Sequence, residues 1–169
     1  MAGEDAGGAH GSNRLGGNGV ANSTVYGGVA GDVMGQDCQE MKALYDPDET
    51  VLDEELTRAM TPFSQKPGDI TVLRNRLQDV MWEDVGVMRD ADGLQRGLKR
   101  IAEIDDELSS VGVAADNLAF NLSWHDWLNL RSLIDMSMVI AKAALSRENS
   151  RGAHSVSYTH LRAHETTDN

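Results

Sequence analysis

The sequence predicts a mainly α-helical protein whose two halves follow different rules. In the second half, apolar residues recur every three or four positions, which is the spacing of one face of a helix. The first 35 residues hold eleven of the seventeen glycines, and residues 35–70 hold all three prolines. We therefore expect a glycine-rich loop and helix first, then a three-helix bundle.

Three apolar faces define the helices of the bundle. They consist of Leu73, Leu77, Val80, Met81 and Val85; of Leu94, Leu98, Ile101, Ile104, Leu108 and Val111; and of Trp127, Leu130, Ile134, Met138, Ala141 and Leu145. Asp92 and Ser123 are the expected N-terminal caps of the second and third helices, although the second could equally begin at Asp90. Gly112 and the polar residues after it predict a turn, so these two helices should run antiparallel.

The glycine-rich half is unusual for a helix. Within residues 19–34 the valines are spaced as on a helix, but each interior glycine costs about 1 kcal/mol relative to alanine. We therefore expect another backbone or a ligand to lie close against this segment. The prolines and the acidic run that follow predict a connector with one short helix near residues 54–60.

Composition excludes several classes of function. The formal net charge of −12, from 15 basic and 27 acidic residues, disfavours a surface that binds nucleic acid or an anionic membrane. The single cysteine, Cys38, excludes a disulfide framework and a cysteine-based zinc site. No run of about 18 apolar residues predicts a membrane span, and no signal peptide is expected.

Two motifs carry a resemblance to a known family. The segment AGEDAGGAHGSNRLGGNGVANSTVYGGVAG, residues 2–31, resembles the carboxyl end of the flavin-binding domain in the succinate dehydrogenase and fumarate reductase flavoprotein family. The segments MWEDVGVMRDADGLQRGLKRI and LNLRSLIDMSMVIAKAALSRENSRGAH are similar to that family's helical carboxyl-terminal domain. The motifs occur in the family's order, and the resemblance covers nearly all of residues 2–155.

The resemblance implies a domain organisation. Residues 1–36 would be the carboxyl end of an α/β FAD-binding domain, residues 37–70 a linker with a short helix, and residues 71–155 the helical carboxyl-terminal domain. Residues 156–169 look like the translation of a sequencing adapter, so we expect a non-native tail and leave its His160 and His164 out of any metal site.

The resemblance also implies roles for residues of the first motif. Arg14 would bind a carboxylate of a dicarboxylate substrate, since a planar guanidinium can hold a carboxylate with two parallel hydrogen bonds. His10 would support the loop or touch the substrate. The residues implied to bind FAD are Glu4, Asn18, Gly19 and Val20. Gly16, Gly17 and Gly19 would let the main chain approach the flavin ring. Neither a catalytic residue nor a metal site is expected in this chain.

The function implied is that of a fragment of an FAD-dependent oxidoreductase that interconverts succinate and fumarate or a similar dicarboxylate. The parent enzyme would lie with its membrane anchor on the cytoplasmic, inner face of the cell membrane and pass electrons to an iron–sulfur subunit. The chain lacks the glycine-rich motif that holds the FAD pyrophosphate, so we expect it to be inactive alone.

Two alternatives remain open. One is a fragment of L-aspartate oxidase, a relative with similar motifs, and the other is a helical interaction module without catalysis. Arg147, Arg151 and His154 could clamp the helical domain to the flavin domain or help to close the active site, and we favour the clamp. Asn149 stands where the family usually has serine.

Overall fold

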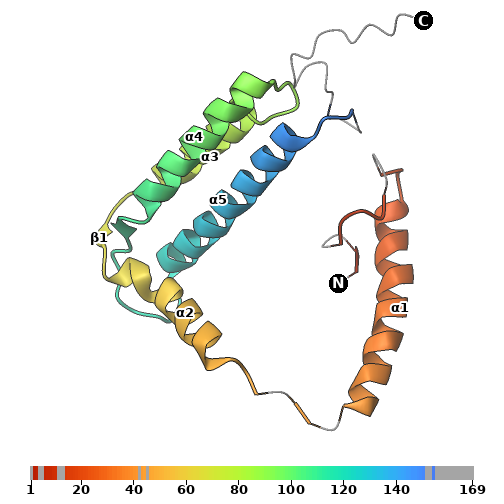
Figure 1. The fold of residues 1–169 in the computed structure, drawn as a ribbon. Coiled ribbons are helices and arrows are strands. Elements are labelled where there is room, and N and C mark those ends of the chain that lie inside the picture. Colours follow the sequence, from red (N-terminus) through yellow and green to blue (C-terminus); the bar gives the residue numbers. More distant parts are fainter. Residues whose placement is uncertain are drawn as a thin grey trace, which may run out of the picture. The chain divides into compact units, whose positions relative to one another are not determined.

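The computed structural model describes residues 2–3, 6–10, 14–41, 43–44, 46–150 and 154. The chain separates into two compact units, residues 1–48 and 49–169. Both units are mainly helical in the described residues (Figure 1), which confirms the mainly helical part of the predicted fold class. The boundary between the units falls inside the predicted connector, residues 37–70.

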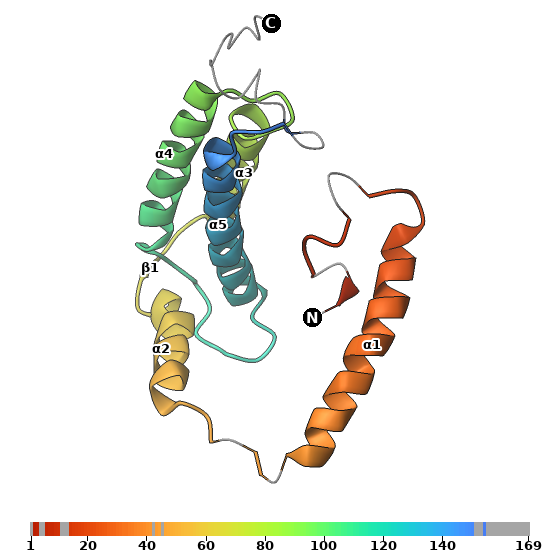
Figure 2. The same cartoon turned by 45° about the vertical axis from the view of Figure 1, so that its right-hand side comes forward.

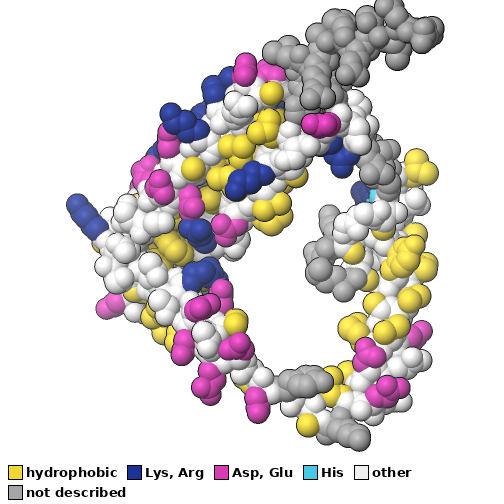
Figure 3. Space-filling model, in the orientation of Figure 1, with side chains coloured by type: hydrophobic (Ala, Val, Ile, Leu, Met, Phe, Trp, Pro, Cys, Tyr) yellow, Lys and Arg dark blue, Asp and Glu magenta, His cyan; other side chains and the backbone are white. Residues whose placement is uncertain are grey.

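The first unit is built on one helix, α1 (Asn18–Glu40). Its apolar side chains, among them Val25, Val29 and Val33, are exposed, and Figure 3 shows hydrophobic side chains gathered along the helix. No described atom would lie within 4 Å of a Cβ added at Gly27, Gly28, Gly31 or Gly35. The close approach predicted from the glycines is therefore not made at these four positions by any described part of the chain.

The second unit contains four α-helices and two very short strands in its described residues. In chain order the elements are α2 (Glu49–Met60), the 3-10 helix η2 (Thr61–Phe63), β1 (Lys66–Pro67), α3 (Ile70–Glu83), α4 (Ala91–Leu108), β2 (Val111–Gly112) and α5 (Leu122–Ser146). Figures 1 and 2 show α3, α4 and α5 side by side, with α4 and α5 running in opposite directions, as predicted. The predicted short helix of the connector corresponds to α2, which begins earlier, at Glu49.

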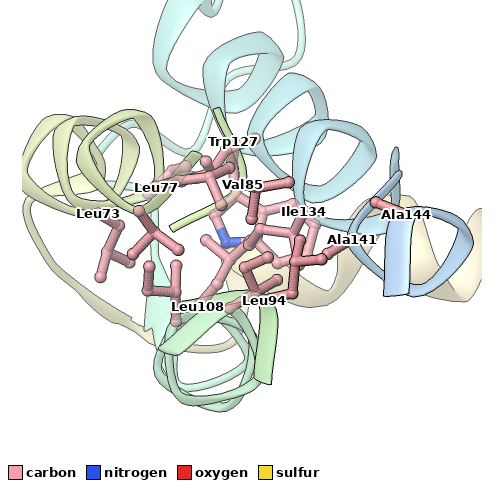
Figure 4. Close-up of a cluster of buried hydrophobic side chains, with 14 residues drawn as sticks. Leu73, Leu77, Val85, Leu94, Leu108, Trp127, Ile134, Ala141 and Ala144 are labelled. Carbon is pink, nitrogen blue, oxygen red and sulfur yellow. The ribbon is translucent and has the colours of Figure 1, made fainter. Parts of the chain in front are cut away.

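The core of the second unit lies between α3, α4 and α5 (Figure 4). Its buried members from the predicted faces are Leu73, Leu77, Val80, Val85, Leu94, Ile101, Ile104, Leu108, Trp127, Leu130, Ile134 and Ala141. The other predicted members, Met81, Leu98, Val111, Met138 and Leu145, are partly buried at its margin. The Nε1 of Trp127 donates a hydrogen bond of 2.8 Å to the Val111 carbonyl, so the polar atom of this buried ring is satisfied. The helical faces read from the sequence are confirmed.

The two caps expected first, Asp92 and Ser123, both lie inside the first turn of their helices and are not the caps. Asp90, the alternative considered for α4, is its N-cap and accepts a hydrogen bond from the Gly93 backbone N–H. Ser123 as the cap of α5 is wrong, because it already lies in the first turn of that helix. The cap is Asn121, whose Oδ1 accepts from the Trp124 N–H at 3.0 Å and whose amide donates to two carbonyls of the preceding loop, those of Ala115 and Asn117.

Gly112 has a different role from the turn that the sequence predicts. It pairs with Pro67 in the two-residue parallel bridge of β1 and β2, and the next residue, Val113, donates its N–H to the Pro62 carbonyl at 3.1 Å. A Cβ at position 112 would overlap with the carbonyl oxygens of Pro62 and Gln65. The glycine is therefore explained by a close approach of two backbones. None of the described helices combines the length and the apolar character that crossing a membrane requires.

Candidate functional site

The candidate site is an open hollow of about 660 Å³ in the first unit, between the start of α1 and the loop before it. It brings together four of the residues predicted from the sequence, namely His10, Arg14, Gly19 and Val20. Asn18 is the exposed first residue of α1 and is not part of the lining. Glu4 lies outside the described residues, so its predicted contact with FAD stays a prediction.

Arg14 lies directly over the first turn of α1. A Cβ built at Gly19 would overlap with the Nη1 atom of Arg14, so the absence of a side chain at Gly19 gives the guanidinium its place. Gly17, the residue before α1, has a φ of 85°, a left-handed conformation that favours glycine. Gly16 has open space around it and no positive φ. Two of the three glycines at the helix start thus have a structural reason within the described chain.

Asn22 joins the loop to the helix, and none of the sequence motifs identified it. Its side-chain Nδ2 donates to the Gly3 carbonyl at 3.1 Å and lies 3.3 Å from Nε2 of His10. It is 6% exposed and is the buried residue of α1. No signal in the sequence marked it, because its partners Gly3 and His10 lie 19 and 12 residues earlier in the chain.

The electrostatics of the hollow favour an anion. Arg14 is the cation of its lining, and no carboxylate lines it among the described residues, although the whole chain carries a net charge of −12. No side chain caps the first turn of α1, which leaves the partial positive charge of that helix end uncompensated by a side chain. A carboxylate at this end of α1 would meet a guanidinium and a favourable helix dipole.

His154 is buried and contacts two residues of the second unit. Its Nδ1 lies 2.9 Å from Nη2 of Arg89, and its Nε2 lies 3.2 Å from the carbonyl oxygen of Arg147, the residue directly after α5. Because a guanidinium can only donate, Nδ1 accepts and Nε2 carries the proton. The ring is 6% exposed. Arg151 lies outside the described residues, so the predicted clamp of Arg147, Arg151 and His154 to a flavin domain stays a prediction.

A second polar cluster lies where α3 meets α4. The carboxylate of Asp84 is 4% exposed and accepts hydrogen bonds from Arg96 at 3.0 Å and from Arg100 at 2.8 Å. Arg100 also donates to Glu83. Its hydrogen bonds to Glu83 and Asp84 raise the pKa of its guanidinium above the ordinary value. This cluster is a structural ion network. No group of three or more potential metal ligands occurs in the part of the chain that the structure describes.

Comparison with known proteins agrees with the resemblance read from the motifs. The family model described as the fumarate reductase flavoprotein C-terminus matches residues 74–165. This match extends into residues 156–169, whose non-native origin stays a prediction.

Three relatives match most of the chain. An uncharacterized FAD-dependent oxidoreductase of Methanocaldococcus jannaschii is 33% identical over 90% of this chain and 27% of its own length. The fumarate reductase flavoprotein of Haemophilus influenzae is 28% identical over 87% and 25%. L-aspartate oxidase 1 of Ralstonia nicotianae is 33% identical over 87% and 25%. The chain spans about a quarter of the length of these relatives.

A solved structure supports the same assignment. Mycobacterium smegmatis Sdh1 in complex with UQ1 superimposes with a TM-score of 0.84, at 33% identity, over 91% of this chain and 26% of that one. Both the sequence match and the structural match therefore extend over both units of the chain. The chain belongs to the succinate dehydrogenase and fumarate reductase flavoprotein family.

Proposed function

We propose that this chain acts as part of an FAD-dependent oxidoreductase that interconverts succinate and fumarate or a similar dicarboxylate. The observation that carries the proposal is the placement of the Arg14 guanidinium over Gly19, in a hollow that no described carboxylate lines. There Arg14 binds one carboxylate of the substrate with two parallel hydrogen bonds. His10, which lines the same hollow, is close enough along the loop to contribute a further contact.

The residues at the start of α1 fit a flavin. FAD supplies the hydride acceptor or donor of the reaction. The backbone of Asn18, Gly19 and Val20 lies at a helix start that no side chain caps, and Gly17 keeps the preceding turn free of a side chain. An uncapped helix start favours the negative charge that a reduced flavin carries. Glu4 would add a hydrogen bond to the cofactor.

Membership of the family supports a proposal for the rest of the enzyme. Electrons pass from the flavin to an iron–sulfur subunit, while a membrane anchor holds the complex at the cytoplasmic, inner face of the cell membrane. A longer flavoprotein provides the pyrophosphate-binding motif, which this chain, at about a quarter of the length of its relatives, lacks. On its own, the chain is expected to be inactive.

A second candidate is an L-aspartate oxidase. It is favoured by the match to the Ralstonia nicotianae protein of that name, which is as similar in identity as the first relative. Aspartate is also a dicarboxylate, so Arg14 would bind one of its carboxylates in the same way. The two candidates differ in the substrate that they turn over.

The test uses the flavoprotein of full length, expressed from the gene with any coding sequence in frame upstream of Met1. Turnover of succinate, fumarate and L-aspartate is measured for the unmodified protein and for Arg14→Gln. We expect turnover of succinate or fumarate, and a loss of kcat/KM in the variant of roughly 10- to 100-fold, since a hydrogen bond to a charged group contributes about 1.5–3 kcal/mol.

Two outcomes would contradict the proposal. Turnover of L-aspartate alone would favour the second candidate. An Arg14→Gln protein with unchanged kcat/KM for every dicarboxylate would remove Arg14 from the substrate site. Lys99→Gln is the control for the loss of one positive charge, because Lys99 lies on α4, outside the hollow. It should leave kcat/KM unchanged.

A further inference from the structure

Asn22 is a buried polar group for which the proposed function gives no reason. It lies in the second turn of α1, where the neighbouring apolar side chain of Val20 is 76% exposed. The loop, and not an apolar core, covers it. A buried side-chain amide needs hydrogen-bond partners, and the Nδ2 of Asn22 has two, the Gly3 carbonyl and Nε2 of His10.

The orientation of the Asn22 amide follows from its contact with Gly3. The Gly3 carbonyl is an acceptor, so the atom facing it at 3.1 Å must be the donor nitrogen Nδ2. A flipped amide would place two acceptor oxygens against each other. The second hydrogen of the same nitrogen is then available for His10 Nε2, at 3.3 Å.

This orientation fixes the tautomer of His10. Because Nδ2 can only donate, Nε2 of His10 must accept, and the proton of the neutral imidazole resides on Nδ1. An unconstrained neutral imidazole in water prefers the opposite tautomer, with its proton on Nε2. Asn22 therefore selects one of two states that differ in which ring nitrogen can donate a hydrogen bond.

We propose that Asn22 is a positioning residue that holds His10 with its proton on Nδ1, so that the ring offers this N–H to the carboxylate bound by Arg14. The carboxylate part of this inference rests on the proposed function, whereas the tautomer part does not. Both His10 and Arg14 line the hollow, and Asn22 is the element of α1 that ties His10 to the helix carrying Gly19. Asn22 itself need not touch the substrate.

The first measurement is the tautomer of His10 in the full 169-residue chain. Long-range proton–nitrogen NMR spectra of the ¹⁵N-labelled protein, at a pH where imidazole is neutral, distinguish a protonated ring nitrogen from a bare one. His10→Gln assigns the signals among the five histidines. We expect Nδ1 to be protonated and Nε2 to be bare. A proton on Nε2 in the unmodified protein would overturn the proposal without any further variant.

Two variants separate positioning from a general structural role. Asn22→Asp has nearly the same shape but can only accept, so the proton of His10 should move to Nε2. Ser23→Ala is the matched control, because Ser23 follows Asn22 on α1 and its hydroxyl bonds to the Gly19 carbonyl. It should leave the tautomer unchanged. A His10 spectrum unaltered by Asn22→Asp would also overturn the proposal.

The second measurement links the tautomer to binding in the flavoprotein of full length. We expect Asn22→Asp to raise the KM for the dicarboxylate about tenfold or more, through one lost hydrogen bond and through the new carboxylate in the hollow, with a smaller change in kcat. His10→Ala loses the hydrogen bond without adding a charge, and it should raise the KM roughly tenfold. An unchanged KM would reject the donor role of His10. If the tautomer is as expected but Arg14→Gln leaves substrate affinity unchanged, the proposed function fails while the selection of the tautomer by Asn22 stands.

Discussion

The missing side chain of Gly19 allows the Arg14 guanidinium to lie against the first turn of α1. An alanine at position 19 would meet only the far end of a flexible side chain, the Nη1 of Arg14, which can move away at little cost. We therefore expect Gly19→Ala to leave the free energy of unfolding unchanged or to raise it by up to about 1 kcal/mol, because alanine favours the helix. The displaced guanidinium should nevertheless weaken dicarboxylate binding about tenfold or more. Chemical denaturation and substrate titration of the full-length flavoprotein measure the two effects.

Gly27→Ala is the control for Gly19→Ala, which is expected to keep or raise the free energy of unfolding while weakening dicarboxylate binding. It is the same change in the same helix, with open space around the added methyl group. It should raise helix stability by a similar amount and leave dicarboxylate affinity unaltered. If Gly19→Ala bound the substrate as well as Gly27→Ala does, the position of Arg14 would not depend on the missing side chain at Gly19.

The start of α5 depends on Asn121 more than on the serine expected from the sequence. Asn121 caps the helix and also bonds to two carbonyls of the loop that precedes it. We expect Asn121→Ala to lower the free energy of unfolding by roughly 1–3 kcal/mol, through the lost cap and the lost loop bonds. Ser123→Ala should change it by less than about 0.5 kcal/mol. Urea denaturation followed by circular dichroism measures both, and equal effects would contradict the assignment of the cap.

The spacing of apolar residues predicted the helices well, because each helix contributes to the core through a regular pattern in its own sequence. Every third or fourth residue of α3, α4 and α5 must face the same interior, so the apolar spacing alone identifies Leu94, Ile101 and Ile134 as core. The family motif added His10 and Arg14, which the structure brings to one hollow. Apolar spacing therefore predicted the helices and their core, and the family motif predicted two residues of the hollow.

The remaining features depend on partners far apart in the chain. Asp84 reads as an ordinary surface acid until Arg96 and Arg100, 12 and 16 residues later, are placed beside it. Asn22 reads as a surface residue of a helix until Gly3, 19 residues earlier, lies over it. Such contacts depend on how distant segments pack in the folded chain, and neither composition nor periodicity predicts that packing.

At the scale of the whole molecule, burial is distributed unequally between the two units. Among the residues that the structure describes, all fourteen members of the buried apolar core lie between Leu73 and Ala144, within the second unit. In the first unit, α1 buries one residue, Asn22, while its valines are exposed. Because helices in proteins gain most of their stability from packing an apolar face, the two units should differ strongly when they are studied apart.

A chain of residues 49–155 should therefore fold without the first unit. It keeps every member of the apolar core, the Asp84 ion network and the contacts of His154, so we expect one cooperative urea transition. The peptide of residues 1–48 should show much less helix by circular dichroism than α1 would give, since it has glycine-rich sequence and little packed surface. Adding FAD to this peptide should not restore the helix, because the pyrophosphate-binding motif is not part of it. A broad, non-cooperative transition of residues 49–155 would show that the helical unit needs residues 1–48 to hold its core together.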